Sequence, residues 1–212
     1  IDYNRLYIDN IITIPYLNGG TSWDWREPYI TAVECKVANI LRKAFKMKDG
    51  AVSIGNVPGF DMLLGNTLCE LKITSNRSSR VHIEYSRYDG SPSGLALSDA
   101  EYYVIFSVGY DNVCNVRFVE TKGLKEVMNL LINNPDPSRM SAFKPVKNDK
   151  GSRSFWIDLE ARRRTGNNIN NIDSLITEYR IMSFGYDAVN KEIDLSHMEI
   201  HDGLSILRRK IK

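Results

Sequence analysis

One short segment of the chain carries the residue types that hydrolyse a phosphodiester. Asp61 is followed nine residues later by Glu70, and Lys72 lies two residues beyond Glu70. Carboxylates hold Mg²⁺, an ion that neutralises charge on phosphoryl oxygens and activates a water molecule. A lysine beside them would orient or deprotonate that water, or stabilise the charged transition state. The spacing therefore predicts a metal-dependent hydrolytic site built from these three side chains.

The segment around Glu70 and Lys72 has the pattern of a β-strand over Thr67–Thr74. Side chains alternate between the two faces of a strand, so the glutamate and the lysine point to the same side. On the opposite face the strand directs three apolar side chains into a core: Cys69, Leu71 and Ile73. We therefore expect a carboxylate and an ammonium side by side at the edge of a sheet. The same spacing also occurs on half-exposed strands, where the two charges are a solvated pair.

Asp61 is delivered to this strand by the preceding segment. Residues 60–64 read as a second strand, and Gly65-Asn66 predicts a tight hairpin turn between the two. Asp61 and Glu70 are the proposed metal ligands, and the backbone carbonyl of Leu71 would add a further oxygen.

A third acidic ligand is expected from an upstream helix. An apolar stripe at helical spacing predicts a helix over residues 28–47; it consists of Ile30, Val33, Val37, Leu41 and Phe45. Glu34 borders this stripe and can face the sheet, which makes it the candidate ligand. A glutamate on the solvated side of the helix is the alternative.

The remaining pattern indicates an α/β domain with a mixed central β-sheet flanked by helices. Strands are predicted at 51–57, 80–87, 102–108, 113–119 and 155–159, a helix at 123–132, a helical turn or cap at 98–101, and a long polar loop at 134–154. The middle strands lie too close together for the crossover helices of a strictly parallel sheet. No element is predicted beyond residue 172.

Composition limits the classes of protein to consider. A chain of 212 residues, 42% apolar and 25% charged, predicts one globular domain, or one domain with an appendage. No apolar run approaches the roughly 18 residues of a membrane helix, so no membrane partner is expected. Three cysteines without short spacing argue against a disulfide framework or a structural zinc site. We expect an intracellular, cytoplasmic protein.

The motif resembles that of a known family. Pro58-Gly59-Phe60-Asp61 together with Glu70-Leu71-Lys72 is similar to the signature of the PD-(D/E)XK nuclease superfamily, with two residues inserted between the proline and the aspartate. Residues 92–103 are similar to a segment of phage-encoded members, and residues 148–159 are a weaker match. The resemblance implies a restriction-endonuclease-like core over 27–160, with an N-terminal extension (1–26) and a basic C-terminal extension (161–212) packed on the core.

The resemblance implies a Mg²⁺-dependent enzyme that cleaves DNA, with Mn²⁺ able to substitute. We expect an endonuclease of the restriction or phage DNA-processing type, acting in the host cytoplasm if phage-encoded. An exonuclease of the phage recombination type, a DNA-binding module with an inactive nuclease fold, and an RNA-cleaving version of the site are the alternatives. Cleavage of both strands commonly needs two sites, which favours a homodimer or a higher homo-oligomer.

Basic clusters indicate where DNA would bind, because the net charge of only +2 does not. The candidate phosphate contacts are Arg77, Arg80 and Arg87, just after the motif strand, and Arg162, Arg163 and Arg164. These loops favour duplex DNA over a small nucleotide, although such runs are often only solvated. His82 and Glu84 share a strand face and either line the cleft or form a polar outer face.

Overall fold

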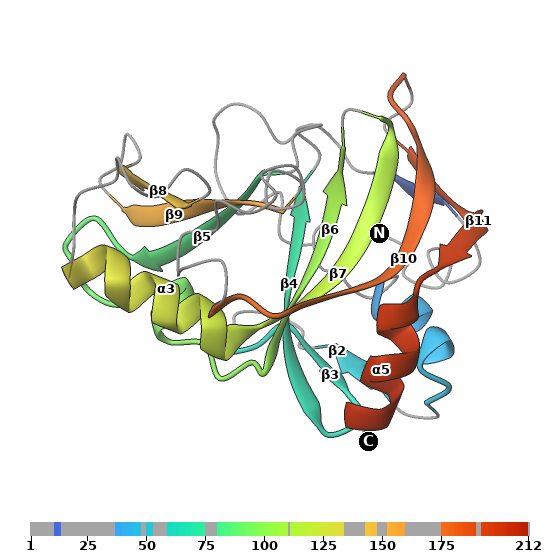
Figure 1. Cartoon of the computed structure of the whole chain (residues 1–212), viewed down its shortest axis with the longest axis horizontal. Helices are drawn as coiled ribbons and strands as arrows, with labels where there is room; N and C mark the ends of the chain where they lie inside the picture. The colour runs from blue at the N-terminus through green and yellow to red at the C-terminus, as the bar shows by residue number, and fades with distance from the viewer. Residues whose placement is uncertain are drawn as a thin grey trace.

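A computed structural model describes residues 11–13, 37–47, 50–52, 59–74, 80–109, 111–133, 143–147, 152–159, 175–189 and 192–211. Its centre is a twisted sheet of eight strands (Figure 1). In spatial order the strands are β1 (Ile11–Thr13), β11 (Glu192–Ile200), β10 (Glu178–Asp187), β7 (Val113–Glu120), β6 (Tyr102–Val108), β4 (Thr67–Thr74), β3 (Met62–Leu64) and β2 (Gly50–Val52). The pairing of β4 with β6 is parallel and the other pairings are antiparallel, so the sheet is mixed.

A smaller antiparallel sheet lies beside the large one. It contains β5 (Arg80–Ser86), β9 (Arg153–Asp158) and β8 (Phe143–Lys147), with β9 in the middle. A short 3₁₀ helix, η2 (Gly94–Ala96), lies in the connection between β5 and β6. The described helices are residues 37–44, α3 (Thr121–Asn133) and α5 (Asp202–Lys210).

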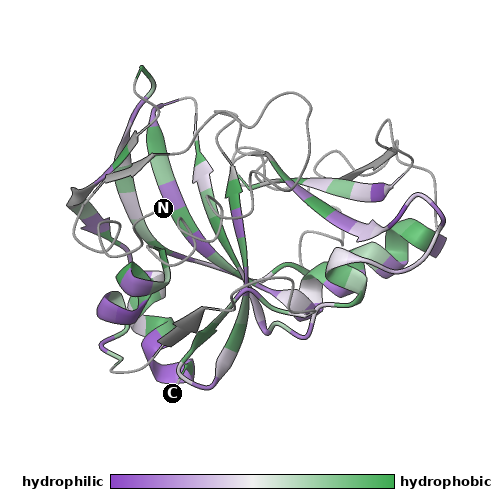
Figure 2. Ribbon diagram, turned by 180° about the vertical axis from the view of Figure 1, so that it is seen from behind, coloured by the Kyte–Doolittle hydropathy of each residue, from purple (hydrophilic) through white to green (hydrophobic). Residues whose placement is uncertain are grey.

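The large sheet has a hydrophobic core on each face. On one face, side chains of β4, β6, β7 and β10 pack against residues 37–45 and α5. On the other, Tyr103 and Ile105 of β6 pack against α3 and the small sheet. Every residue of β6 is buried, because the strand is covered on both faces. Hydrophobic and hydrophilic residues alternate along α3 and α5, as expected of helices with one buried face (Figure 2).

Much of the predicted framework is confirmed. The α/β character and the mixed sheet with flanking helices are as expected, and the strand Thr67–Thr74 has the predicted bounds. Gly65-Asn66 forms the predicted turn, with Gly65 at φ +60°. Residues 37–44 are helical as predicted; residues 28–36 lie outside the described part of the chain.

Two predictions of local structure are wrong. The polar loop over 134–154 contains β8 and the first residues of β9. Pro145 made the segment look irregular, but β8 is an edge strand of the small sheet, where a missing N–H is tolerated. The helical turn predicted at 98–101 is also absent, and a 3₁₀ helix at Gly94–Ala96 lies just before it.

The C-terminal segment contributes directly to the large sheet. β10 pairs with β7, and β11 pairs with both β10 and β1. Leu204 and Leu207 of α5, and Ile211 just after it, are buried in the same core as residues 37–45. Residues 175–211, which lie within the predicted C-terminal extension, are therefore part of the main fold. Within the described residues, no helix combines the length and the apolar character needed to cross a bilayer.

Candidate active site

Asp61 lies where the pairing of β3 with β4 stops. β3 pairs only with the first residues of β4, ending at Met62 opposite Cys69. The Asp61 N–H donates to the Cys69 carbonyl (2.9 Å), and the Asp61 Oδ2 accepts the Leu71 N–H (2.7 Å). The carboxylate thus replaces a neighbouring strand as the acceptor at this edge of β4. Its other oxygen, Oδ1, accepts no hydrogen bond from the described residues.

Glu70 and Lys72 point to the same face of β4, as the alternation predicted. The Lys72 Nζ donates to the Glu70 Oε1 (2.8 Å), and 15% of the Glu70 side chain and 35% of the Lys72 side chain are exposed. Cys69 and Leu71 are buried in the core on the opposite face. Because most of the Glu70 side chain is buried, this ion pair differs from a fully solvated pair on the surface.

The two carboxylates are close enough to interact. Burial raises the pKa of Asp61 above its usual value, and the charge of Glu70 raises it further, whereas the Leu71 N–H and the Lys72 charge lower it. Two partly buried carboxylates are unfavourable together unless a cation or a proton relieves the repulsion. This donor set is suited to a hard divalent cation such as Mg²⁺.

The parallel pairing of β4 with β6 adds Tyr103 to the site. Tyr103 lies directly opposite Glu70, and the Lys72 Nζ is 5.9 Å from the centre of its ring. Burial raises the pKa of the Tyr103 hydroxyl, as does the charge of Glu70; the nearby Ser98 side chain lowers it, and the charge of Asp61 raises it. The Tyr103 side chain therefore lies beside Glu70 and below the Lys72 ammonium.

The turn that presents Asp61 is held by the segment before β6. The Gly59 carbonyl accepts the Asp99 N–H (2.9 Å) and the Ser98 hydroxyl (3.2 Å). Gly59 has φ +107°, a conformation that other residues rarely adopt. Gly59 and Phe60, which stand between Pro58 and Asp61, therefore lie at a turn whose backbone is held by these contacts.

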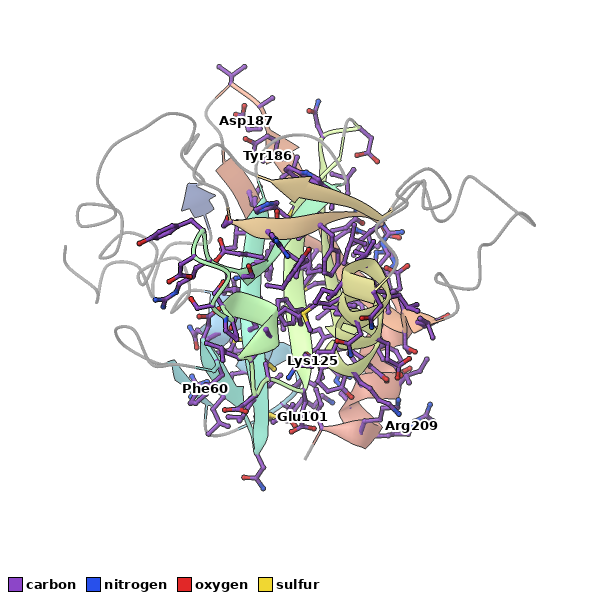
Figure 3. The ribbon with its side chains drawn as sticks, turned by 90° about the vertical axis from the view of Figure 1, so that its left-hand side faces the viewer. Phe60, Glu101, Lys125, Tyr186, Asp187 and Arg209 are labelled. Carbon is purple, nitrogen blue, oxygen red and sulfur yellow. The ribbon has the colours of Figure 1, made fainter. Side chains whose placement is uncertain are left out.

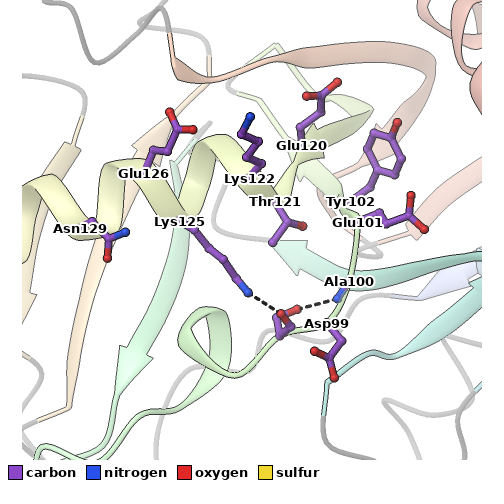
Figure 4. A pocket seen from close by; sticks show the side chains of 11 residues that line it. Asp99, Ala100, Glu101, Tyr102, Glu120, Thr121, Lys122, Lys125, Glu126 and Asn129 are labelled. Carbon is purple, nitrogen blue, oxygen red and sulfur yellow. Dashed lines mark hydrogen bonds between the residues drawn. The ribbon is translucent and has the colours of Figure 1, made fainter.

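A pocket of about 640 Å³ lies behind this turn, at the beginning of α3 (Figure 4). The Lys125 Nζ donates to the Ser98 carbonyl (2.7 Å), and the Ala100 N–H donates to the Ser98 hydroxyl (3.2 Å). Phe60, Glu101 and Lys125 lie toward one end of the molecule, and Tyr186 and Asp187 toward the opposite end (Figure 3). The pocket lining has four acidic side chains (Asp99, Glu101, Glu120 and Glu126) and two lysines (Lys122 and Lys125), so its net charge is negative.

His82 and Glu84 lie on one face of β5, on the side of the site near Lys72. Burial lowers the pKa of His82, the charge of Glu84 raises it, and the charge of Lys72 lowers it. His82 Nε2 and Ser154 Oγ share a hydrogen bond, and the Ser93 hydroxyl donates to Glu84 (2.6 Å).

The structure describes only some of the predicted ligands and DNA contacts. Glu34, Arg77, and Arg162, Arg163 and Arg164 lie outside the described residues. Arg87 is exposed just after β5, and Arg80 begins β5 opposite Asp158. Within the described ranges, no three His, Cys, Asp or Glu side chains gather closely enough to hold a metal ion. Of the predicted ligands, Asp61 and Glu70 are the two that the structure brings together, and Glu34 as the third remains a prediction.

The basic C-terminal run has structural partners. Arg208 donates through Nε to the Ala44 carbonyl (2.9 Å), which ties α5 to the end of the first described helix. Lys210 donates to Glu120 (3.3 Å) and to the Tyr179 hydroxyl.

Comparison with known proteins gives no further guide: no protein-family model, no curated protein and no solved structure matches the chain. Sequence reasoning missed Tyr103 and Ser98, which look like ordinary core and loop residues until β4 and β6 are paired.

Proposed function

We propose that this protein is a Mg²⁺-dependent nuclease that hydrolyses DNA phosphodiester bonds as an endonuclease. The observation that carries the proposal is that Asp61, Glu70 and Lys72 converge at the end of β3 on one side of β4. Burial, and then the charge of Glu70, raise the pKa of Asp61, and a bound cation would offset both effects. The mixed sheet with flanking helices is consistent with the restriction-endonuclease-like core that the motif implies.

The donor set supports a hard cation at this point. Asp61 Oδ1 and Glu70 Oε2 accept no hydrogen bond from the described residues, and we assign these two oxygens to the ion. Glu34 and the Leu71 carbonyl would complete the ligand set. The ion would supply charge neutralisation on the phosphate and a more acidic water.

The protein's own groups then have separable roles. The Leu71 N–H fixes Asp61 Oδ2, which holds the carboxylate at the strand edge. Glu70 holds the Lys72 ammonium over the Tyr103 ring. From there Lys72 would orient the attacking water and stabilise charge that develops on the phosphoryl oxygens. The buried ring of Tyr103 would keep water away from the side of Lys72 that faces the core.

Cleavage of defined DNA forms tests the proposal. We expect wild-type protein to nick or linearise supercoiled plasmid with Mg²⁺ or Mn²⁺ and to be inactive with chelator. Asp61→Asn and Lys72→Ala should each lower the rate by about 100-fold or more. Lys43→Ala, an exposed lysine on the first described helix, is the matched control and should cleave normally.

Three results would change the proposal. Loss of linear DNA only would indicate an exonuclease. DNA binding without cleavage under either metal would indicate a binding module with an inactive site. Faster cleavage of RNA in a side-by-side assay would reassign the substrate.

A further inference from the structure

The small sheet has one apolar face and one face that carries two aromatic rings. Val81, Ile83, Phe155 and Ile157 point into the core shared with α3. The intervening residues point the other way, and His82 of β5 lies directly opposite Trp156 of β9. Their ring centres are 5.0 Å apart at an angle of 50°, and both side chains are only half-buried.

These two rings are held rigidly. Trp156 lies on the central strand of the small sheet, paired with β5 on one side and β8 on the other. His82 is fixed by its hydrogen bond to Ser154, a residue with no exposed surface. A rigid aromatic surface that is partly open to solvent can stack on another flat ring with little loss of side-chain entropy.

The position of the rings connects them to the candidate active site. His82 is on β5, which contacts β4, the strand that carries Lys72. Burial lowers the pKa of His82, which favours a neutral, aromatic imidazole near neutral pH. A nucleic-acid strand whose phosphate lies at Lys72 on β4 would run toward the neighbouring β5, where the two rings could receive a base.

We propose that His82 and Trp156 form a stacking platform for an unpaired nucleobase next to the phosphodiester that is cut. The inference rests on the proposed function and adds a substrate class to it. Bases within a duplex are already stacked on their neighbours, whereas an unpaired base at a frayed end, a flap or a bulge is free to stack on protein rings. The enzyme should therefore bind DNA with unpaired bases more tightly than a fully paired duplex.

Binding without metal tests the platform separately from cleavage. Short single-stranded DNA is titrated in chelator while tryptophan fluorescence is followed. We expect wild-type fluorescence to be quenched on binding, and Trp156→Ala to bind about tenfold more weakly. Trp156→Phe keeps a stacking ring and should retain most of the affinity while losing the quench. Tyr88→Ala, which removes an exposed aromatic outside the small sheet, is the matched control and should bind normally.

A scan with abasic sites locates the stacked base. Each base of the strand is removed in turn, and wild-type affinity should fall at one position where Trp156→Ala shows no further loss. Normal binding by Trp156→Ala, checked for folding by circular dichroism, would overturn the platform. Normal binding by His82→Ala together with an unchanged quench would exclude His82 from it. Failure of wild type to bind any DNA strand would also overturn it.

The two proposals fail in distinguishable ways. Wild-type protein that binds with a Trp156-dependent quench but never cuts with Mg²⁺ or Mn²⁺ would retain the platform and lose the nuclease. Protein that cuts with Mg²⁺ while Trp156→Ala binds normally would retain the nuclease and lose the platform.

Discussion

Lys72 interacts with residues of three strands, β4, β5 and β6. It donates to Glu70 on its own strand, lies over the ring of Tyr103 on β6, and lowers the pKa of His82 on β5. Replacing Lys72 should therefore change the pKa of His82, whether or not the protein cleaves DNA.

The first prediction uses this connection. In Lys72→Ala the pKa of His82 should rise relative to wild type, because a positive charge that disfavours protonation is lost. NMR titration of the imidazole signals measures the change. Equal titration of His82 in both proteins would contradict the placement of Lys72.

The second prediction concerns the stability of metal-free protein. The pKa of folded Asp61 lies above its ordinary value of 3.8, so proton binding stabilises the folded form. This stabilisation is complete below the ordinary pKa and is lost as pH rises through the raised pKa. Asp61→Asn keeps an acceptor for the Leu71 N–H but has no charge to bury. At pH 7 in chelator it should melt at a higher temperature than wild type, and the difference should shrink on acidification. A lower melting temperature for Asp61→Asn at pH 7 would contradict this assignment.

Some residues of the site could be predicted from the sequence, and others could not. Asp61, Glu70 and Lys72 could be predicted because the alternation within one strand places two of them together. Tyr103 could not, because its contact with Glu70 depends on parallel pairing between strands separated by β5 and η2. The pairing of His82 with Trp156 likewise depends on the register of β5 and β9.

At the scale of elements, the connection between β5 and β6 controls the shape of the site. It carries η2, then the Ser98 and Asp99 contacts that hold the Asp61 turn. Gly94 lets this connection approach β5, since a Cβ at that position would lie 2.4 Å from the Glu84 carbonyl oxygen. A displaced connection should therefore disturb Asp61 through backbone contacts.

The third prediction compares two glycines of this connection. Gly94 and Gly90 both have positive φ, but a Cβ at Gly90 would meet nothing within 4 Å. Gly90→Ala should cost about 1 kcal/mol of unfolding free energy from backbone strain alone. Gly94→Ala should cost about 1–3 kcal/mol more, because it also clashes with backbone. Urea unfolding measures both, and equal costs would show that the close approach to β5 does not exist.

Some elements are hard to predict for a physical reason. β10 has consecutive buried residues, Ile181 and Met182, at a bulge where its register with β7 shifts. A bulge breaks the alternation by which strands are recognised. By contrast, β4, β6 and β7 are continuous, and their bounds could be predicted to within about one residue, a closer match than element boundaries usually allow.

At the scale of the whole molecule, segments distant in sequence close one core. α5 packs beside the first described helix, and Arg208 donates to the end of that helix (Figure 1). The buried side chains of α5 are Leu204 and Leu207, three residues apart on one face, and the core continues with Ile211 just after the helix. The sheet order, with β10 between β7 and β11, follows from long-range pairing and could not be predicted from any single segment.

The fourth prediction tests whether α5 is integral to the domain. Leu207 has no exposed surface, whereas its neighbour Ile206 is 37% exposed. Leu207→Ala should lower the free energy of unfolding by about 2–5 kcal/mol. Ile206→Ala should lower it by at most about 1 kcal/mol. Urea unfolding followed by circular dichroism measures both. If the two variants are equally stable, α5 is a dispensable appendage.

The position of β10 and α5 has a consequence during synthesis of the chain. The ribosome makes the segments that carry Asp61, Glu70 and Tyr103 well before β10, β11 and α5. Until those later segments emerge, one side of β7, with Cys114, Val116 and Phe118, has no complete cover. The nascent chain must therefore expose apolar surface while its first strands are already able to pair, a state that is prone to aggregation. Efficient production of this protein should depend on chaperones or on slow, cool expression.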